Sequence, residues 1–267
     1  MSERKAPLNR RDVLTILGLG GLAAMTGKFI TDSQLFPAQT HLEVEEPEKA
    51  GRHRWIMVIS MEKCTGCDQC TWACQATKNT PDSITWNVIT HEHTSKGREY
   101  HIARPCLHCE NPPCTDVCPV GATYLREEDG LVVMDYDKCI GCRYCQVACP
   151  YGARSFNWQD PTNLPRSHVP EWGDPEVEVR PRGVVEKCTF CIERMDRAIE
   201  EGLTPGEDHD VTPACVNACP AEARFFGDLN DPDSKVSQLI RKNPTIRLRE
   251  ELGTAPRVYY IPPEGGF

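Results

Sequence analysis

The sequence is poor in aromatic residues and has no excess of positive charge. Aromatic residues account for only 7% of its 267 residues, so the material for a large conventional hydrophobic core is scarce. The formal net charge is -9, from 30 basic and 39 acidic residues, which argues against a nucleic-acid-binding protein with a basic footprint. Apolar residues make up 39% of the chain, too few for a polytopic membrane protein.

Several motifs of catalysis and cofactor binding are also missing. The sequence contains no phosphate-binding loop of the form G-x-x-x-x-G-K-[ST], no dinucleotide fingerprint and no recognisable nucleophile–base pair. Covalent haem is excluded, because no C-x-x-C pair is followed by histidine. The residues that stand after four of these pairs are Asp68, Glu110, Arg143 and Ile192. The sequence therefore offers no visible means of binding a substrate.

Cysteine, glycine and proline are abundant instead. The 16 cysteines make up about 6% of the chain, below the range that marks a small disulfide scaffold. Glycine and proline number 19 and 22, which is typical of a loop-rich fold. With so few aromatic residues, something other than hydrophobic burial must help to stabilise the chain, and the cysteines are the obvious candidates.

The cysteines form four sets of four that repeat one ligand pattern. The sets are Cys64-x2-Cys67-x2-Cys70-x3-Cys74, Cys106-x2-Cys109-x4-Cys114-x3-Cys118, Cys139-x2-Cys142-x2-Cys145-x3-Cys149, and Cys188-x2-Cys191 followed after 23 residues by Cys215-x3-Cys219. Proline follows the last cysteine of three sets, and Gln75 stands there in the first. This spacing is that of bacterial ferredoxins with two [4Fe-4S] clusters, in which the fourth cysteine of a set reaches the neighbouring cluster. Four sets therefore predict four clusters in two pairs.

Zinc and disulfides are the alternative uses for these thiols. Structural zinc prefers C-x2-4-C pairs separated by a longer loop, so only the fourth set could form a zinc ribbon. The first and third sets place three thiolates close together with a fourth pointing away, which does not make one tetrahedron. Sixteen cysteines in an exported protein would suggest disulfides, unless a metal caps the thiols before export. Iron–sulfur clusters are the favoured interpretation.

The pattern between the sets predicts secondary structure but leaves the pairing of the sets open. We expect strands at 55–59, 84–89, 99–103 and 131–134, and a helix at 192–201. Sets two and three are closest in sequence, which favours one inner module at 105–154. Sets one and four would then form an outer module from 55–104 and 155–228. Pairing set one with two and three with four is topologically simpler but leaves longer gaps inside each pair.

Cations recur next to the cysteine sets. A lysine immediately precedes the first cysteine of three sets, and an arginine lies two residues before that of the second; these residues are Lys63, Lys138, Lys187 and Arg104. A cation beside a cluster favours its more negative, reduced form and so raises its potential. The alternative is that each is an ordinary solvated residue at the end of a strand. His108, between two ligands of the second set, is interpreted as a loop residue.

The amino-terminal sequence has the features of an export signal. Arg10 and Arg11 form a twin-arginine pair before the apolar run 13–24, which indicates the Tat route. No clear A-x-A cleavage site follows, so an uncleaved tether remains an alternative. We expect a signal segment at 1–38, an acidic linker at 39–54, and a location in the periplasm or on the outer face of the cytoplasmic membrane. Tat carries folded proteins, which suits a chain that receives its metal in the cytosol.

The segment 155–187 is rich in proline and carries three aromatic residues. They are Phe156, Trp158 and Trp172. A long ordered loop with exposed aromatic side chains is a candidate docking surface for a partner, and a packed lid over the clusters is an equally good interpretation.

The four sets, with the split fourth set ending in Cys215-x3-Cys219-Pro220, resemble the iron–sulfur electron-transfer subunits of the dimethyl sulfoxide, polysulfide and tetrathionate reductases. The match covers about residues 55–228. The resemblance implies an α+β fold of tandem, nested bacterial-ferredoxin-like modules with loop-rich insertions. It also implies four [4Fe-4S] clusters, a molybdopterin-type catalytic partner and an integral membrane quinone-binding subunit. The tail 229–267 would face a partner.

The same resemblance implies which cysteines share a cluster. The four ligand sets are Cys64, Cys67, Cys70 and Cys219; Cys74, Cys188, Cys191 and Cys215; Cys106, Cys109, Cys114 and Cys149; and Cys118, Cys139, Cys142 and Cys145. Some relatives replace the third cysteine of the second set and lose one iron there. Cys114 is present here, so a complete fourth cubane is expected.

Two classes of function follow from these ligands. A cluster that acts as a Lewis acid needs an open iron site, whereas sixteen ligands for four cubanes leave none open. We therefore expect no catalytic residues, and a chain that relays electrons between a quinone-linked membrane subunit and a molybdopterin oxidoreductase. The alternative is an iron–sulfur subunit of a quinol-oxidising or cytochrome-linked membrane complex without molybdenum.

Overall fold

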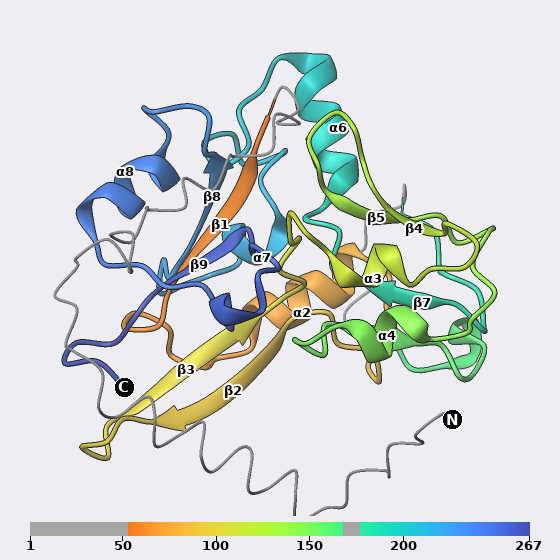
Figure 1. Cartoon of the computed structure of the whole chain (residues 1–267), viewed down its shortest axis with the longest axis horizontal. Helices are drawn as coiled ribbons and strands as arrows, with labels where there is room; N and C mark the ends of the chain where they lie inside the picture. The colour runs from red at the N-terminus through yellow and green to blue at the C-terminus, as the bar shows by residue number, and fades with distance from the viewer. Residues whose placement is uncertain (1–52, 168–176) are drawn as a thin grey trace, which may run out of the picture. The chain divides into compact units, whose positions relative to one another are not determined.

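Short strands and short helices alternate with long loops in residues 53–167 and 177–267, the part of the chain that this computed structural model describes (Figure 1). The elements are β1 (Trp55–Ser60), α2 (Gln69–Thr77), β2 (Val88–His93), β3 (Glu99–Arg104), α3 (Pro113–Asp116), β4 (Thr123–Leu125), β5 (Val132–Met134), α4 (Tyr144–Ala148), β6 (Arg154–Phe156), η1 (Pro161–Asn163), β7 (Val185–Lys187), α6 (Ile192–Glu201), α7 (Ala214–Asn217), β8 (Arg224–Asp228), α8 (Lys235–Lys242), η2 (Glu250–Leu252) and β9 (Val258–Ile261). The mixture of strand and helix confirms the broad α+β expectation.

Strand β1 is the centre of the one three-stranded sheet formed by the described residues. It pairs antiparallel with β8, from Trp55 opposite Asp228 to Ile59 opposite Arg224, and parallel with β9. All six of its residues are buried, because both faces of the strand are covered. Alternate residues point to opposite faces, so Ile56 packs toward α8 while its neighbours pack toward the cysteines.

Three two-stranded antiparallel sheets complete the strand pairing of the described chain: β2 with β3, β4 with β5, and β6 with β7. The expected strands at 55–59, 99–103 and 131–134 and the helix at 192–201 are confirmed. The strand expected at 84–89 is wrong in its bounds, since β2 starts only at Val88. Ile84 and Trp86 instead pack against the core, so their hydrophobicity reflects burial in a loop.

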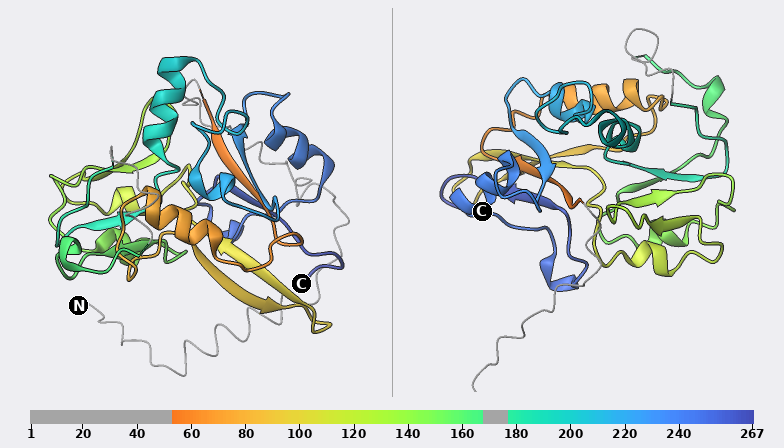
Figure 2. Two further views of the ribbon diagram at one scale, coloured as in Figure 1. Left: turned by 180° about the vertical axis from the view of Figure 1, so that it is seen from behind. Right: turned by 90° about the horizontal axis from the view of Figure 1, so that it is seen from above.

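Helices bring pairs of cysteine sets together. Helix α2 follows the loop of set one and packs on α7, which carries Cys215 of set four. Helix α4 follows the loop of set three and packs on α3, which carries Cys114 of set two. Each contact thus joins cysteines that are distant in sequence, and Figure 2 shows the two groups of elements from two further directions.

The C-terminal tail is part of the folded core. Strand β9 pairs with β1, and the side chains of Val258 and Tyr260 are fully buried. Helix α8 covers the other face of β1 through Val236. The tail 229–267 thus contributes a strand and a helix to this sheet, and its expected contact with a partner stays a prediction. The strand is accommodated because β1 has two edges to pair, and β8 supplies only one neighbour.

Some expectations fall outside the described residues. The twin arginines at 10 and 11, the signal segment, nearly all of the linker, and Trp172 belong to 1–52 or 168–176. Within 53–167 and 177–267, none of the helices has the length and apolarity required to cross a membrane.

Candidate metal centres

The sixteen cysteines, none of which forms a disulfide, gather in groups of four that draw on different sequence sets. Three cavities are each lined by four cysteines: site I by Cys64, Cys67, Cys70 and Cys219; site II by Cys74, Cys188, Cys191 and Cys215; and site IV by Cys118, Cys139, Cys142 and Cys145. The atom-free space in them, counting solvent at the mouth, is about 300, 290 and 290 Å³ respectively. Each of the three spaces is bordered by four sulfur donors, which suits one kind of occupant at all three.

The remaining four cysteines are neighbours of one another and form site III, which comprises Cys106, Cys109, Cys114 and Cys149. Burial raises the pKa of Cys109 to about 12, and the negative charges of Cys106, Cys114 and Cys149 add to this rise. The grouping of the cysteines in all four sites is the same as that implied by the family resemblance.

Burial makes these thiols poor thiolates unless a metal compensates their charge. It raises the pKa of Cys188 to about 12 and that of Cys215 to about 11. Four soft sulfur donors around one space fit an iron–sulfur cluster, which keeps its ligands deprotonated. Each site would thus hold a group that accepts and returns single electrons, while its own residues bind, shield and tune that group.

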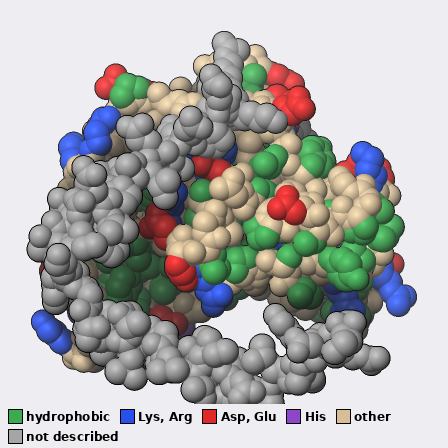
Figure 3. Space-filling view, in the orientation of Figure 1, with side chains coloured by type: hydrophobic (Ala, Val, Ile, Leu, Met, Phe, Trp, Pro, Cys, Tyr) green, Lys and Arg blue, Asp and Glu red, His purple; other side chains and the backbone are tan. Residues whose placement is uncertain are grey.

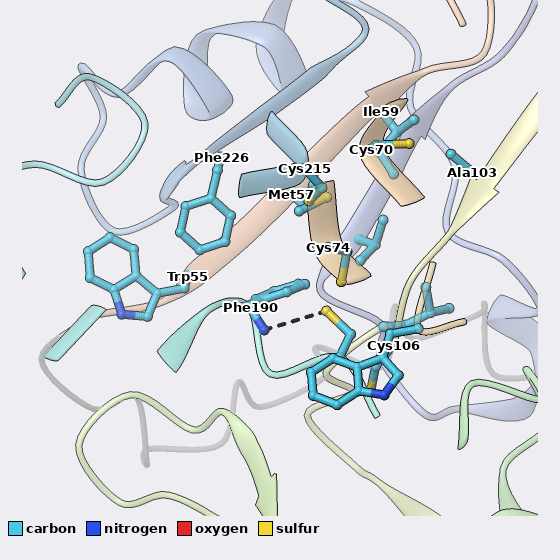
Figure 4. Close-up of a cluster of buried hydrophobic side chains, with 14 of the residues drawn as sticks. Trp55, Met57, Ile59, Cys70, Cys74, Ala103, Cys106, Phe190, Cys215 and Phe226 are labelled. Atoms are coloured by element: carbon cyan, nitrogen blue, oxygen red, sulfur yellow. Dashed lines mark hydrogen bonds between the residues drawn. The ribbon is translucent and has the colours of Figure 1, made fainter. Parts of the chain in front are cut away.

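Hydrogen-bond donors point at several of the sulfurs. The Asn87 side-chain amide donates to Cys70 Sγ over 3.1 Å, and the backbone N–H of Ala223 donates to Cys219 Sγ over 3.3 Å. The N–H of Phe190 faces Cys188 Sγ at 3.5 Å (Figure 4). At Cys118 burial would raise the pKa, but hydrogen bonds from four backbone N–H groups outweigh it and lower the pKa. Such donors stabilise negative sulfur and tune cluster potentials.

A shared backbone kink shapes all four C-x2-C loops. The residue just before the second cysteine has a positive φ in every set: Gly66 (68°), His108 (42°), Gly141 (69°) and Phe190 (56°). Glycine tolerates this region readily, whereas bulky residues adopt it only when their surroundings hold them there. Sets one and three therefore use glycine, and sets two and four need another source of stability.

His108 and Phe190 provide that stability for each other. Their rings stack with centroids 4.0 Å apart, and His108 Nε2 lies 3.0 Å from the carbonyl oxygen of Cys188. Phe190 also packs edge-on against Phe226, which stacks on Trp55 (Figure 4). The interpretation of His108 as a simple loop residue missed this role: its side chain is fully buried between sites II and III.

The four predicted tuning cations lie in different surroundings. Lys63 and Lys138 are exposed; the first lies over the ring of Phe225 and the second pairs with Asp135 at 2.7 Å. Arg104 is half-buried at the end of β3. Lys187 is fully buried and donates to the carbonyl oxygens of Val132 and Cys188. Of the four, Lys187 is the one placed to act on cysteines without screening by water, and the tuning role stays a prediction.

Three further buried cations lie beside the cysteines and were not predicted from the sequence. Arg224 lies against Cys215, Cys70 and Cys219, so it faces sites I and II. Arg154 lies against Cys114, Cys145 and Cys106, so it faces sites III and IV. Lys78 lies near Cys191 and Cys74 of site II and forms an ion pair with Glu193. Burial opposes the charge of each, but the nearby anions outweigh it and raise all three pKa values.

A repeat in the sequence could have revealed the two arginines. The segments Cys149-Pro150-Tyr-Gly-Ala-Arg154 and Cys219-Pro220-Ala-Glu-Ala-Arg224 share the pattern C-P-x-x-A-R. In both, the arginine is the first residue of the strand that follows the set, β6 or β8. The same position after set two is Thr123, the first residue of β4, to whose hydroxyl Arg154 donates over 2.9 Å.

Comparison with known proteins defines the class of the chain. The sequence profile of the 4Fe-4S dicluster domain matches residues 97–163, and a second profile of the same description matches residues 138–223. The chain is therefore a ferredoxin-like protein with 4Fe-4S cluster domains, and these domains serve electron transfer.

Curated relatives specify the family. The iron–sulfur cluster-binding subunit of menaquinone reductase from Nitratidesulfovibrio vulgaris is 46% identical, over 78% of this chain and 88% of its own length. A protein of Halobacterium salinarum, named for the iron–sulfur subunit of dimethyl sulfoxide reductase, is 47% identical over 77% of this chain and 78% of its own length. The Hdr-like menaquinol oxidoreductase iron–sulfur subunit 1 of Archaeoglobus fulgidus is 37% identical, over 95% of this chain and 97% of its own length.

Further relatives include one subunit of the tetrathionate reductase of Salmonella typhimurium and one of the polysulfide reductase of Wolinella succinogenes. The chain belongs to this family of iron–sulfur subunits of dimethyl sulfoxide, polysulfide and tetrathionate reductases. It is an electron-transfer subunit of an oxidoreductase complex and not its catalytic subunit.

Proposed function

We propose that the chain holds four [4Fe-4S] clusters, one in each of sites I to IV, and relays electrons between a quinone-linked membrane subunit and a molybdopterin-type catalytic subunit. The observation that carries the proposal is the convergence of sixteen thiols from four sequence sets on four sites of four. No site has a spare position, so each cluster is fully ligated and transfers electrons without binding a substrate.

The nested arrangement of two ferredoxin-like modules is part of the proposal. Sites I and II draw their ligands from sets one and four, and sites III and IV from sets two and three. The strand pairs support this: β8 after set four pairs with β1 before set one, as β4 after set two pairs with β5 before set three. The helix pairs α2 with α7 and α4 with α3 follow the same correspondence.

An apolar surface next to site IV supports docking of a protein partner. Ile140, Tyr144 and Val147 are 64%, 63% and 85% exposed, and the last two share one face of α4. Trp158 is also exposed beneath the guanidinium of Arg143, the residue after Cys142. Figure 3 shows hydrophobic side chains over the part of the surface that carries β4, β5 and α4. Exposed apolar residues in such a group are typical of an interface.

A complex without molybdenum is the second candidate. Two of the five relatives named above carry menaquinone or menaquinol in their names, and one of the two matches 95% of this chain. The cysteines of sites I to IV would serve a complex with or without molybdenum equally well, because the same kind of cluster passes electrons in both. The catalytic partner therefore decides between the two candidates.

Export through the Tat route remains our proposal for localisation, to the periplasm or the outer membrane face. Arg10 and Arg11 before a short apolar run support it. Anchoring would come from a partner or from an uncleaved signal segment.

The assignment of site III is tested by replacing Cys114 with serine. We expect about 16 iron atoms in the unaltered chain and the loss or conversion of one cluster in the variant, because three thiolates remain around site III. Iron analysis and electron paramagnetic resonance of the reduced protein measure this. Survival of all four cluster signals unchanged would mean that Cys114 is not a ligand.

The partners are tested by purifying the intact complex from membranes. We expect co-purification with a large catalytic chain that contains molybdenum, and with an integral membrane chain whose quinol reduces the clusters. A complex that transfers electrons from quinol but contains no molybdenum would favour the second candidate. Fractionation of the same cells reports the localisation, and recovery of the mature complex only from the cytosol would contradict export.

A further inference from the structure

Three histidines and a glutamate share one face of the β2–β3 hairpin. In the register of this hairpin His91 stands opposite His101, and His93 stands opposite Glu99. Residues two apart in a strand point to the same side, so these four side chains form a two-by-two group. His91, His93 and Glu99 are exposed and His101 is partly buried, so the group is accessible from solvent on the hairpin drawn in Figure 1.

Three of the four already have the geometry of an incomplete metal site. The ligand atoms of His91, Glu99 and His101 lie within 4.8 Å of one another. His91 Nδ1 is 3.5 Å from a Glu99 carboxylate oxygen, and the rings of His91 and His101 meet edge-on with centroids 4.7 Å apart. Ligands around a tetrahedral zinc ion lie about 3.4 Å apart, so the ligand atoms must approach one another by up to about 1.4 Å. Exposed side chains such as His91 and Glu99 can rotate by that amount.

His101 provides a second observation in favour of a ligand. Its Nδ1 atom is buried and has no hydrogen-bond partner in residues 53–167 and 177–267. A buried ring nitrogen without a partner is costly in a structural histidine. Two imidazoles and a carboxylate are a donor set that zinc and similar divalent ions prefer, with His93 or water as the fourth ligand.

We propose that the face formed by His91, His93, Glu99 and His101 binds one divalent transition-metal ion of the zinc type, separate from the four cluster sites. The site would also act on site I. The ring of His101 packs against Gly66, where an added Cβ would meet three ring atoms at 3.1 Å. Gly66 lies between Cys64 and Cys67, so an ion held by His101 adds positive charge close to site I. On the proposed function, this charge raises the reduction potential of the site I cluster.

The binding test uses the complete, iron-loaded chain, because empty cysteine sites would themselves take up zinc. Zinc is titrated in competition with a chelating dye, and zinc and iron are then counted in the same desalted sample. We expect one zinc per chain with the iron content unchanged. The double variant H91N/H101N should bind zinc at least about 100-fold more weakly, because two ligands are lost.

H209N is the matched control. His209 is exposed beside Asp210, at 3.6 Å, but lies far along the chain from the hairpin. This variant should bind zinc like the unaltered chain. Zinc binding that is absent, or equal in H91N/H101N and the unaltered chain, would overturn the site.

A potentiometric titration followed by electron paramagnetic resonance tests the effect on site I. Zinc should shift one cluster signal to a more positive potential, and H91N/H101N should abolish the shift. Zinc that binds without moving any potential would overturn the proposed effect on site I and leave the binding site established. A preparation that contains no iron would contradict the proposed function. Even then, the difference in zinc uptake between the unaltered chain and H91N/H101N would show whether the hairpin binds zinc.

Discussion

Replacement of Arg224 by methionine is expected to lower the reduction potentials of the clusters proposed for sites I and II and to leave those proposed for sites III and IV unchanged. Arg224 is fully buried against Cys70, Cys215 and Cys219. A unit charge about 7 Å away at an effective dielectric constant of about 20 contributes about 2.4 kcal/mol, or about 100 mV for one electron. The potential shifts to a more negative value, because the lost cation stabilised the more negative, reduced form of the cluster.

Arg154 offers the matched experiment in the other pair of sites. It starts β6 as Arg224 starts β8, and it faces Cys106, Cys114 and Cys145. R154M should therefore lower the reduction potentials of the clusters proposed for sites III and IV. R224K keeps the positive charge, so its clusters in sites I and II should have potentials close to those of the unaltered chain. Redox titrations followed by electron paramagnetic resonance measure all four signals. Equal shifts at all four clusters in R224M would contradict the pairing of sites around each arginine.

R224M also removes a structural contact, which the lysine variant helps to separate from charge. Arg224 donates to Asn87 Oδ1 over 2.5 Å, and Asn87 in turn donates to Cys70 Sγ. Loss of this chain of hydrogen bonds lowers stability in both variants, whereas the loss of charge occurs only in R224M. The difference in potential between R224M and R224K therefore reports the charge.

Local sequence spacing predicted the four cysteine sets, and the family resemblance supplied the way in which they share clusters, but neither predicted the surroundings of the cysteines. The spacing C-x2-C-x2-C-x3-C is dictated by the shape of a cluster, so it survives in any fold that holds one. The charges around a cluster depend on tertiary packing instead. Lys63 and Lys138 are adjacent to cysteines in sequence but point to solvent, whereas Arg154 and Arg224 are five residues away and buried beside them.

The strand content was predictable only where hydrophobicity and pairing agree. The run at 55–59 became the central strand β1, while the run at 84–89 is hydrophobic because Trp86 is buried in a loop. Strand β9 consists of β-branched and aromatic residues typical of a strand, but its pairing with β1, about 200 residues earlier, could not be predicted from its own sequence. The stacked pair His108 and Phe190 is likewise a tertiary feature: neither residue indicates a positive φ by itself.

Replacement of Gly141 by alanine is expected to empty site IV. A Cβ at this position would lie 2.1 Å from the carbonyl oxygen of Gly183, a backbone atom that cannot rotate away. Gly183 is itself fixed, because its N–H donates to the carbonyl oxygen of Asn157 over 2.8 Å. The loop from Cys139 to Cys142 must then move out of place. We expect the iron content to fall by about a quarter, from about 16 to about 12 atoms per chain.

Two other glycines separate this steric effect from the cost of the backbone conformation. Gly152 has a φ of +60° with no atom within 4 Å of an added Cβ, so G152A should cost only about 1 kcal/mol and keep all its iron. Gly66 is the equivalent of Gly141 in site I, but an added Cβ meets the His101 ring at 3.1 Å, and that side chain can yield. The iron content and the stability of G66A should therefore lie between those of G141A and G152A. Iron analysis and thermal unfolding of the three variants check this order, and a G141A chain that matches G152A in both would show that the Gly183 carbonyl can move without disturbing the site.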